Sequence, residues 1–308
     1  MISSRDIAVT ALAPIIWGST YIVTTEFLPG DAPISLAMLR ALLAGIVLML
    51  IVRRLPDREW ISRIVVLGAL NFSIFWVLLF VAAYRLPGGV AATVGSIQAL
   101  LVIFLSRAVL GTQVRVLAVV AAVMGMGGVA LLLLTPSDAL DPLGVIAGLG
   151  GAASMAAGSV LSRRWRAPVP AITFTAWQLM AGGVLLLPFA VAFEPSIASY
   201  SPTSFLALAY LSIFGAALTY VLWIRGLDRI PLTAVSALGF LSPLSAVALG
   251  WLCLGQTLSV GQFAGALIVL TSVWFGQRAA TNDNAGERSL TSASKRSSSV
   301  NVGVRHRC

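Results

Sequence analysis

Several polar and aromatic side chains lie inside long apolar stretches of this sequence, where a polar group needs a partner or a ligand. The first stretch carries Trp17, Thr20, Tyr21 and Thr24. In a helix, Trp17 and Tyr21 are one turn apart, as are Thr20 and Thr24, so the side chains form two adjacent stripes. This combination of rings and hydroxyl groups predicts the wall of a ligand cavity. The alternative is helix–helix packing through small and hydroxyl residues.

Arg40 and Glu26 are the charged residues that bear most directly on ligand binding. Arg40 lies about seven residues, or roughly 10 Å, below the predicted outer surface, and Glu26 lies near the outer end of the preceding helix. We predict an ion pair between them, because pairing lowers the cost of each charge in a membrane. Arg40 is then a structural clamp, an arginine reaching for the outer interface, or the anchor for a substrate carboxylate. Glu26 is the one acidic residue predicted within the membrane, which makes it the candidate gate or proton carrier.

Further candidates lie deeper in the apolar stretches of both halves of the chain. The residues predicted to contact a ligand there are Asn71, Trp76, Gln98, Trp177, Gln178, Tyr220 and Ser242. An interhelical hydrogen bond is an equally good interpretation for each, and Tyr220 could also belong to the interfacial aromatic belt. Pro243 follows Ser242 and frees a backbone carbonyl near the middle of its helix, which is typical of a hinge or a ligand contact.

The elements that carry these side chains are predicted to be membrane-spanning helices. The chain is 58% hydrophobic and 10% charged, with a mean hydropathy of +0.96, and a bilayer accommodates that much apolar surface whereas a soluble core does not. Apolar runs of about 20 residues, bounded by turn or charge signals, predict ten spans. They cover approximately residues 7–27, 33–52, 64–84, 90–109, 114–134, 143–163, 170–193, 203–224, 232–253 and 259–276.

The distribution of arginine predicts that both ends of the chain are cytoplasmic. In that orientation the inner connections contain nearly every arginine of the short loops, for example Arg53, Arg54 and Arg115, whereas the outer connections contain only Arg85. A net charge of +9 can indicate nucleic-acid binding. Here the basic residues lie in short gaps between apolar runs, so we expect no nucleic-acid partner.

Residues 85–111 and 229–255 resemble each other without a gap, 144 residues apart. Both begin with Arg-x-Pro, at Arg85 and Arg229, and both end with Leu-Gly. Five helices per half is an odd number, so the second half enters the membrane from the opposite side. Inverted repeats of this kind are common in secondary transporters, with the substrate site between the halves. We expect an all-α membrane protein in which two inverted five-helix repeats, 1–134 and 143–276, surround a central cavity. A disordered cytoplasmic tail is expected over 277–308.

Three stretches also carry a resemblance to a known family. WGSTYIVT at residues 17–24, LRALLAG in the second helix and YRLPGGVAATVGSIQALLV across the third and fourth resemble the drug/metabolite transporter superfamily. Within it, they are most similar to the EamA-type permeases and their PecM-like branch. The resemblance covers residues 7–276 and implies a ten-helix exporter of the bacterial inner membrane with a central cavity. Members of this superfamily move amino acids, other metabolites or toxic compounds, often outward.

These observations together predict a secondary transporter that exports a small metabolite, namely an amino acid, an aromatic compound or an amphipathic compound, by alternating access. The sequence has no phosphate-binding loop, no metal-ligand spacing and no nucleophile with a base. We therefore expect no enzymatic activity, no metal and no cofactor. A non-transporting membrane assembly or sensor module is the alternative, and a membrane enzyme is a weaker one. A homodimer is also open, because the helix at 114–134 carries Gly125, Gly127 and Gly128, which suit packing against lipid, a neighbouring helix or a second subunit.

Overall fold

The structure is a computed structural model that describes residues 3–28, 32–86, 88–133, 141–194, 201–254 and 259–279, and within these ranges it is all-helical with no strand. Ten of its helices are long and apolar enough to cross a membrane. They are Ser4–Thr24, Pro33–Val52, Arg58–Arg85, Val90–Leu110, Val116–Leu133, Pro142–Arg164, Ala171–Phe193, Pro202–Arg229, Leu232–Cys253 and Val260–Ala279. The predicted all-α fold with ten membrane-spanning helices is confirmed.

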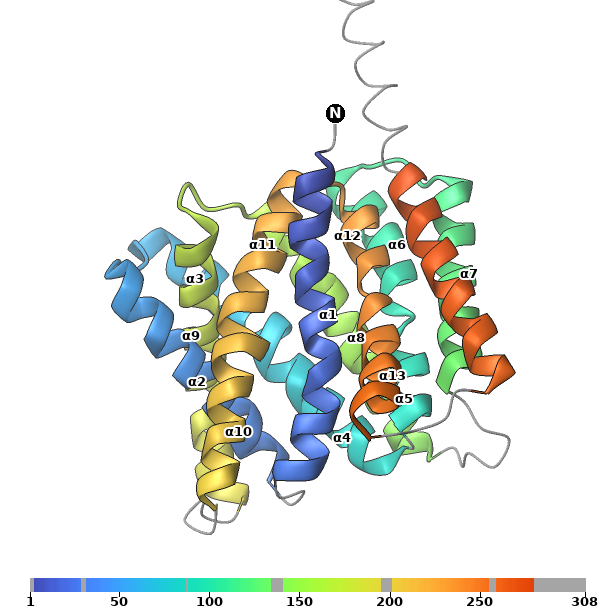
Figure 1. Cartoon of the computed structure of the whole chain (residues 1–308). Coiled ribbons are helices and arrows are strands. Elements are labelled where there is room, and N and C mark those ends of the chain that lie inside the picture. Colours follow the sequence, from blue (N-terminus) through green and yellow to red (C-terminus); the bar gives the residue numbers. More distant parts are fainter. Residues whose placement is uncertain are drawn as a thin grey trace, which may run out of the picture.

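Several spans are built from more than one helical segment (Figure 1). The first half contains α1 (Ser4–Phe27), α2 (Pro33–Val52), α3 (Arg58–Gly68), η1 (Ala69–Ile74), α4 (Phe75–Arg85), α5 (Gly88–Gly95), α6 (Gln98–Leu110) and α7 (Val116–Leu133). The second half contains α8 (Pro142–Arg164), α9 (Ala171–Phe193), α10 (Pro202–Ser212), η3 (Ile213–Leu218), α11 (Thr219–Arg229), α12 (Leu232–Leu238) and α13 (Leu241–Leu254). The segments η1 and η3 are π-helical turns, and the tenth span follows α13.

The third and eighth spans are longer than predicted, because their charged ends are helical. The sequence pattern predicted 64–84 and 203–224, whereas the helices cover Arg58–Arg85 and Pro202–Arg229. The prediction ended each span at the first charged residue. In the structure the charged residues at these ends belong to the helix and extend it beyond its apolar part. The last helix similarly continues to Ala279. The predicted tail beyond it lies outside the described residues.

The two halves repeat the same helix breaks at the same places. η1 and η3 begin 144 residues apart, and each lies between two α-helices of 11 residues. The first two helices of each half, α1 with α8 and α2 with α9, begin 138 residues apart. We call residues related by these offsets repeat mates: 138 residues within the first two helices of each half, and 144 residues thereafter.

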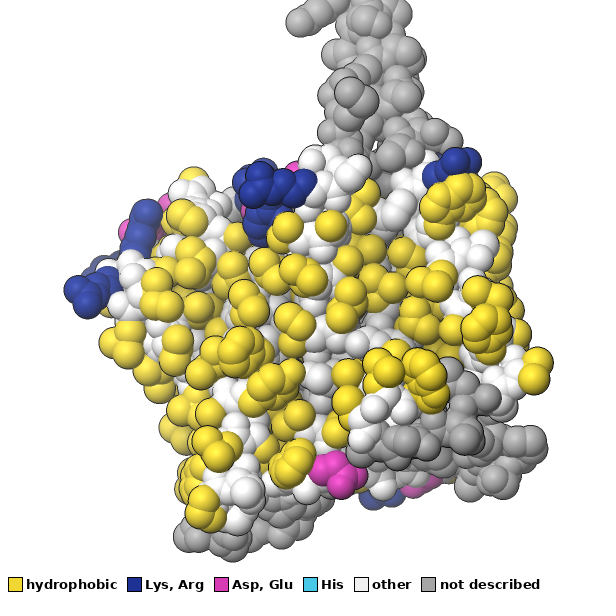
Figure 2. Space-filling model, viewed as in Figure 1, with side chains coloured by type: hydrophobic (Ala, Val, Ile, Leu, Met, Phe, Trp, Pro, Cys, Tyr) yellow, Lys and Arg dark blue, Asp and Glu magenta, His cyan; other side chains and the backbone are white. Residues whose placement is uncertain are grey.

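The halves are inverted with respect to the membrane. α3 lies toward the end of the molecule where the chain begins and α4 toward the opposite end, whereas α10 and α11 have the reverse order (Figure 1). The side chains of arginine gather on the end where the chain begins, and a broad hydrophobic belt covers the surface between the two ends (Figure 2).

α2 and α9 form the largest helix–helix contact and lie on the axis that relates the halves. Glycine allows their backbones to approach: a Cβ on Gly45 would lie 2.8 Å from the Met180 nitrogen, and one on Gly183 would lie 2.9 Å from the Leu42 nitrogen. Gly45 and Gly183 are repeat mates, as are Leu42 and Met180. The contact is therefore reciprocal, as expected for a pseudo-two-fold axis.

α7 packs against the tenth span through a second reciprocal contact. A Cβ on Gly265 would lie 2.8 Å from the Gly128 carbonyl oxygen, and the Ser272 hydroxyl donates to the Ala121 carbonyl at 2.7 Å. Gly128 and Ser272 are repeat mates, and so are Ala121 and Gly265. Of the partners predicted for the glycine-rich helix, a neighbouring helix of the same chain thus occupies the Gly128 face.

The α2–α9 contact can be tested with Gly45→Ala. We expect a loss of stability of about 1–3 kcal/mol, because the new methyl group meets backbone atoms that cannot move aside. Gly127→Ala in α7 is the matched control, since a Cβ there has nothing within 4 Å. Thermal unfolding of both purified variants in detergent measures the difference, and equal Tm values would show that the close approach at Gly45 is unimportant.

Candidate functional site

Five aromatic side chains from three spans pack together between the two halves. We call Trp17, Phe72, Trp76, Tyr220 and Trp223 the aromatic cluster. Ring centroids lie 5.1 Å apart for Trp17 with both Tyr220 and Trp223, 4.6 Å for Phe72 with Tyr220, and 5.3 Å for Phe72 with Trp76. All except Trp17 are buried. Tyr220 therefore belongs to the interior, not to an interfacial belt.

Arg40 on α2 lies beside the aromatic cluster and is 3% exposed. Its guanidinium lies 4.7 Å from the centre of the Trp76 ring, and its Nη2 donates to the Gly215 carbonyl of η3 at 2.6 Å. The Trp17 indole donates to the same carbonyl at 3.2 Å and to the Thr219 hydroxyl at 2.9 Å. A cation is thus held inside the protein by a carbonyl dipole and a ring face.

A second polar group lies in the other half, at η1. Asn71 donates to the Gln178 amide oxygen at 2.8 Å and to the Ser162 hydroxyl at 3.1 Å. All three residues are buried. Two further hydrogen bonds hold η1 against its neighbours. Ser73 of η1 donates to the Gly182 carbonyl of α9 at 2.8 Å, and Ser154 of α8 donates to the Leu70 carbonyl of η1 at 2.7 Å. These contacts match the alternative prediction for Asn71 and Gln178, namely an interhelical hydrogen bond.

The two polar groups occupy equivalent positions in the repeats. Arg40 and Gln178 are repeat mates, and so are Gly215 and Asn71. In each half the second helix therefore sends a polar side chain to the π-helical turn of a span from the other half. π-helical turns are frequent at functional sites, because their backbone leaves hydrogen-bonding groups unpaired. One half fills the position with a neutral amide, and the other with a cation.

The predicted ion pair between Arg40 and Glu26 is absent among the described residues. Glu26 is exposed at the end of α1, whereas Arg40 is turned inward to Gly215. Because the Glu26 carboxylate is exposed, water can solvate it, and it needs no buried partner. Arg40 is accordingly neither paired with Glu26 nor extended to the membrane surface. A proton-carrier role for Glu26 stays a prediction, and it now concerns an exposed group.

The other candidates are distributed around this centre. The Thr20 hydroxyl is buried on α1 without a hydrogen-bond partner among the described residues, and the side chain of Tyr21 lies outside them. Gln98 and Trp223 line a narrow crevice together with Ser159. The Trp223 indole nitrogen and the Ser159 hydroxyl have no partner there. Ser242 is half-buried in α13, where its carbonyl faces Gly18 of α1.

Trp177 lies apart from the aromatic cluster, and a role for it in ligand binding stays a prediction. Its indole donates to the Arg54 carbonyl at 2.6 Å, just beyond the end of α2. At the opposite end of α2, the Glu194 carboxylate accepts from the backbone amides of Ile34 at 2.7 Å and Ser35 at 2.5 Å. Since helix termini leave such groups unpaired, both residues fasten α9 to α2 at the two ends.

Among the residues that the structure describes, side chains fill the place expected for the central cavity. The aromatic cluster and Arg40 occupy the interface between the halves, and the crevice lined by Gln98, Ser159 and Trp223 has no space for a water molecule. Further contacts between the two halves lie at the two membrane faces.

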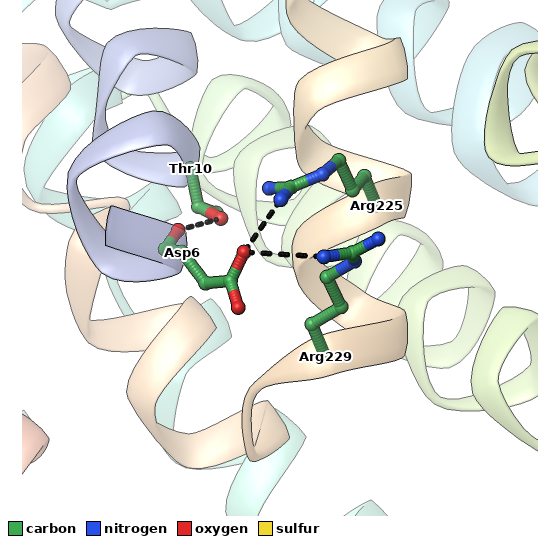
Figure 3. A network of polar contacts seen from close by, with 4 residues as sticks. All are labelled: Asp6, Thr10, Arg225 and Arg229. Carbon is green, nitrogen blue, oxygen red and sulfur yellow. Dashed lines mark hydrogen bonds and ion pairs between the residues drawn. The ribbon is translucent and has the colours of Figure 1, made fainter. Parts of the chain in front are cut away.

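At the face where the chain begins, Asp6 of α1 pairs with two arginines of α11 (Figure 3). Its carboxylate lies 2.5 Å from Arg225 Nη2 and 3.5 Å from Arg229 Nη1. Gly226 lies between these arginines, and an added Cβ there would collide with Thr10 of α1. The glycine lets the two helices approach closely enough for the ion pairs to form. We call this group the N-face clamp.

At the opposite face, Arg85 at the end of α4 pairs with Asp141 before α8, with Nη1 and Oδ2 3.2 Å apart. Arg85 and Arg229 are repeat mates, and the acidic residues both lie at the start of the first helix of a half. The Leu143 backbone amide and then the Arg85 guanidinium hold the pKa of Asp141 below its ordinary value. The carboxylate thus stays ionised around neutral pH and would lose its charge only in strong acid. We call this pair the opposite-face clamp.

The two clamps differ in exposure. The side chains of the N-face pair Arg225 and Asp6 are 25% and 18% exposed, against 47% and 32% for Arg85 and Asp141. Exposed ion pairs are screened by water and contribute little. Arg163 of α8 further secures the N-face by donating to the carbonyls of Leu227 and Ile230 at the end of α11. Of the two clamps, the opposite-face pair is therefore the more strongly screened.

Sequence reasoning missed several of these residues. Phe72 gave no signal because it is one apolar residue among many, and Gly215 contributes only a carbonyl. Asp6 was placed outside the first helix, although an acidic residue in a first turn is a usable signal. The 144-residue offset pointed to Arg85 and Arg229 as equivalents, but their acidic partners become visible only when the helices are packed.

Comparisons with known proteins identify relatives across nearly the whole chain. The EamA-like transporter family matches twice, over residues 5–134 and 142–275. Protein PecM of Dickeya dadantii (strain 3937) is 45% identical over 263 residues, which cover 85% of this chain and 88% of that protein. The uncharacterized inner membrane transporter YedA of Escherichia coli (strain K12) is 30% identical over 264 residues, covering 84% and 86%.

Two further matches are more distant. A probable amino-acid metabolite efflux pump of Escherichia coli (strain K12) is 24% identical over 300 residues, covering 90% of this chain and 97% of that protein. One crystal structure superposes with a TM-score of 0.76 over 91% of this chain and 99% of its own, at 21% identity. That likeness supports the fold alone.

The buried amide group can be tested with Gln178→Ala. We expect a loss of about 1–3 kcal/mol, because Asn71 would keep only Ser162 as a partner and a cavity would remain. Gln113→Ala in the exposed connection between α6 and α7 is the matched control. Thermal unfolding in detergent should show a lower Tm for the first variant alone. A Tm that Gln178→Ala leaves unchanged would mean that the hydrogen bond to Asn71 adds nothing to stability.

Proposed function

The chain belongs to the EamA-like transporter family and is a multi-pass protein of the cytoplasmic membrane, and on this premise we propose that it exports a small metabolite by alternating access. The relative named as a probable amino-acid metabolite efflux pump supports outward movement of a compound of that size. The arginine-rich face where the chain begins supports a cytoplasmic N-terminus. In this orientation the N-face clamp closes the cytoplasmic side.

The observation that carries the proposal is the pair of clamps at opposite faces of an inverted repeat. Alternating access requires that the interior open to one side while it stays closed to the other, and inverted repeats achieve this when the halves exchange conformations. The N-face clamp joins the first and eighth spans, and the opposite-face clamp joins the third and sixth, which are their counterparts. An ion pair that includes one of the repeat mates Arg85 and Arg229 is thus available to close either side.

Transport itself can be tested with the full chain in proteoliposomes. We expect saturable flux of at least one member of a panel of radiolabelled amino acids and aromatic metabolites, without added ATP. Protein-free liposomes are the control. A non-transporting assembly or sensor module predicts no flux, so a panel that crosses no faster than in the control would contradict the proposal.

The clamps can be tested by measuring how accessible the interior is from outside the cell. A Thr20→Cys reporter, in a chain carrying Cys253→Ser and Cys308→Ser, is labelled with a membrane-impermeant maleimide. Asp141→Asn should raise the labelling rate several-fold, because Arg85 loses the charge that holds the outer side closed. Asp6→Asn should leave it unchanged or lower it, because the inner side would open instead.

Asp57→Asn is the control for both variants, since Asp57 is exposed before α3 and outside either clamp. If Asp6→Asn raises the labelling rate and Asp141→Asn does not, the clamps control access but the orientation in the membrane is opposite to the one proposed. If neither Asp6→Asn nor Asp141→Asn changes the labelling rate relative to Asp57→Asn, the clamps do not control access.

A further inference from the structure

Building on the proposed transport function, we propose that Arg40 binds the carboxylate of an organic acid whose apolar, aromatic body packs against the aromatic cluster. Three features of the site support this substrate class. Arg40 has no carboxylate partner among the described residues, the equivalent position of the other repeat carries a neutral side chain, and the Gly215 carbonyl accepts from both Arg40 and Trp17.

Arg40 is a buried cation without a carboxylate partner in the described part of the chain. It is 3% exposed, its Nη2 donates to the Gly215 carbonyl, and its Nε has no hydrogen-bond partner among the described residues. A charged side chain inside a membrane protein is costly unless it is paired or used. Glu26, the acidic residue predicted to pair with it, is exposed at the end of α1.

The fold itself does not require a charge at this position. Gln178, the repeat mate of Arg40, occupies the equivalent place in the other half and satisfies Asn71 with a neutral amide. Both helices pack in the same way through Gly45 and Gly183. A neutral side chain would therefore suffice for packing, and the positive charge of Arg40 is explained by an anionic ligand.

The Gly215 carbonyl allows Arg40 to change partners at little cost. It accepts from Arg40 at 2.6 Å and also from the Trp17 indole at 3.2 Å. If Arg40 turns to a carboxylate, Trp17 still satisfies the carbonyl, so no buried acceptor is left unpaired. The planar guanidinium can then present two parallel N–H groups to the two carboxylate oxygens.

The surroundings of Arg40 select the rest of the ligand. The centre of the Trp76 ring lies 4.7 Å from the guanidinium, and the Tyr220 ring packs against both Trp76 and Phe72. Rings of this kind bind an apolar or aromatic body by burial and stacking. With one cation and no other charge in the cluster, the site suits a singly charged acid better than a polyanion.

Three probes with one skeleton and different charge test this assignment: 3-phenylpropionate, 3-phenylpropanamide and 3-phenylpropylamine. The full chain is titrated with each in detergent, and binding is followed by tryptophan fluorescence. The wild type should bind the carboxylate roughly tenfold to a hundredfold more tightly than the amide, as expected for a charge-assisted hydrogen bond, and should bind the amine most weakly.

Arg40→Gln reproduces the residue of the other half and should abolish the preference for the carboxylate over the amide. Arg40→Lys keeps the charge without the planar fork, so it should retain a weaker preference. Arg58→Gln at the exposed start of α3 is the matched control and should behave as the wild type. If Arg40→Gln does not fold, the wild type must show the preference and Arg40→Lys must reduce it.

Three results would overturn the assignment: no carboxylate binding by the wild type, equal binding of carboxylate and amide, or a preference that survives in Arg40→Gln. Failure of the transport function is distinguished by the flux panel in proteoliposomes. If the protein transports members of the panel without preferring acids, only the proposed anion site is contradicted. If it transports none of them, the proposed transport function is contradicted as well.

Discussion

The constraint on which this structure depends is that a membrane interior offers no hydrogen-bonding partner. Every polar group inside the bundle must be satisfied by another part of the chain or by a ligand. Asn71 donates to Gln178 and to Ser162, and the Trp17 indole reaches a backbone carbonyl. Among the described residues, Arg40 and Gln178 each keep one buried nitrogen without a hydrogen-bond partner. Of these two, only Arg40 also carries a charge, and this is why the anion site is proposed there.

The inverted repeat gives the molecule two versions of each contact. The packing of Gly45 on Met180 is mirrored by Gly183 on Leu42, and π-helical turns occur at equivalent places in the third and eighth spans. The proposed anion site and the proposed gating both lie where the repeats differ. Arg40 replaces the equivalent glutamine beside the aromatic cluster, and the clamps at the two faces differ in exposure. A perfectly symmetric protein would have no preferred side and no single cation at its centre.

Much of the fold was predictable, because apolar length and arginine placement act locally. The ten spans were found close to their true limits, and errors arose where charges such as Arg58 and Asp228 continue a helix beyond the apolar region. The site was less predictable. Candidate polar residues could be selected by type. The direction in which each side chain points, and the partner that it contacts, could not be predicted. Glu26 and Arg40 look like a pair in sequence, yet one is exposed and the other faces Gly215, 175 positions away.

The sequence by itself determined that this is a ten-span membrane protein of two related halves, because hydrophobicity and repeat spacing are properties of the chain alone. It also selected the residue types that could bind a ligand. Only the tertiary structure decided which of them meet. Trp17, Phe72 and Tyr220 come from three spans distant in sequence, and Trp177 proves to fasten two helix ends together. Contacts of this kind depend on helix rotation and crossing, which side-chain packing sets and a linear pattern does not contain.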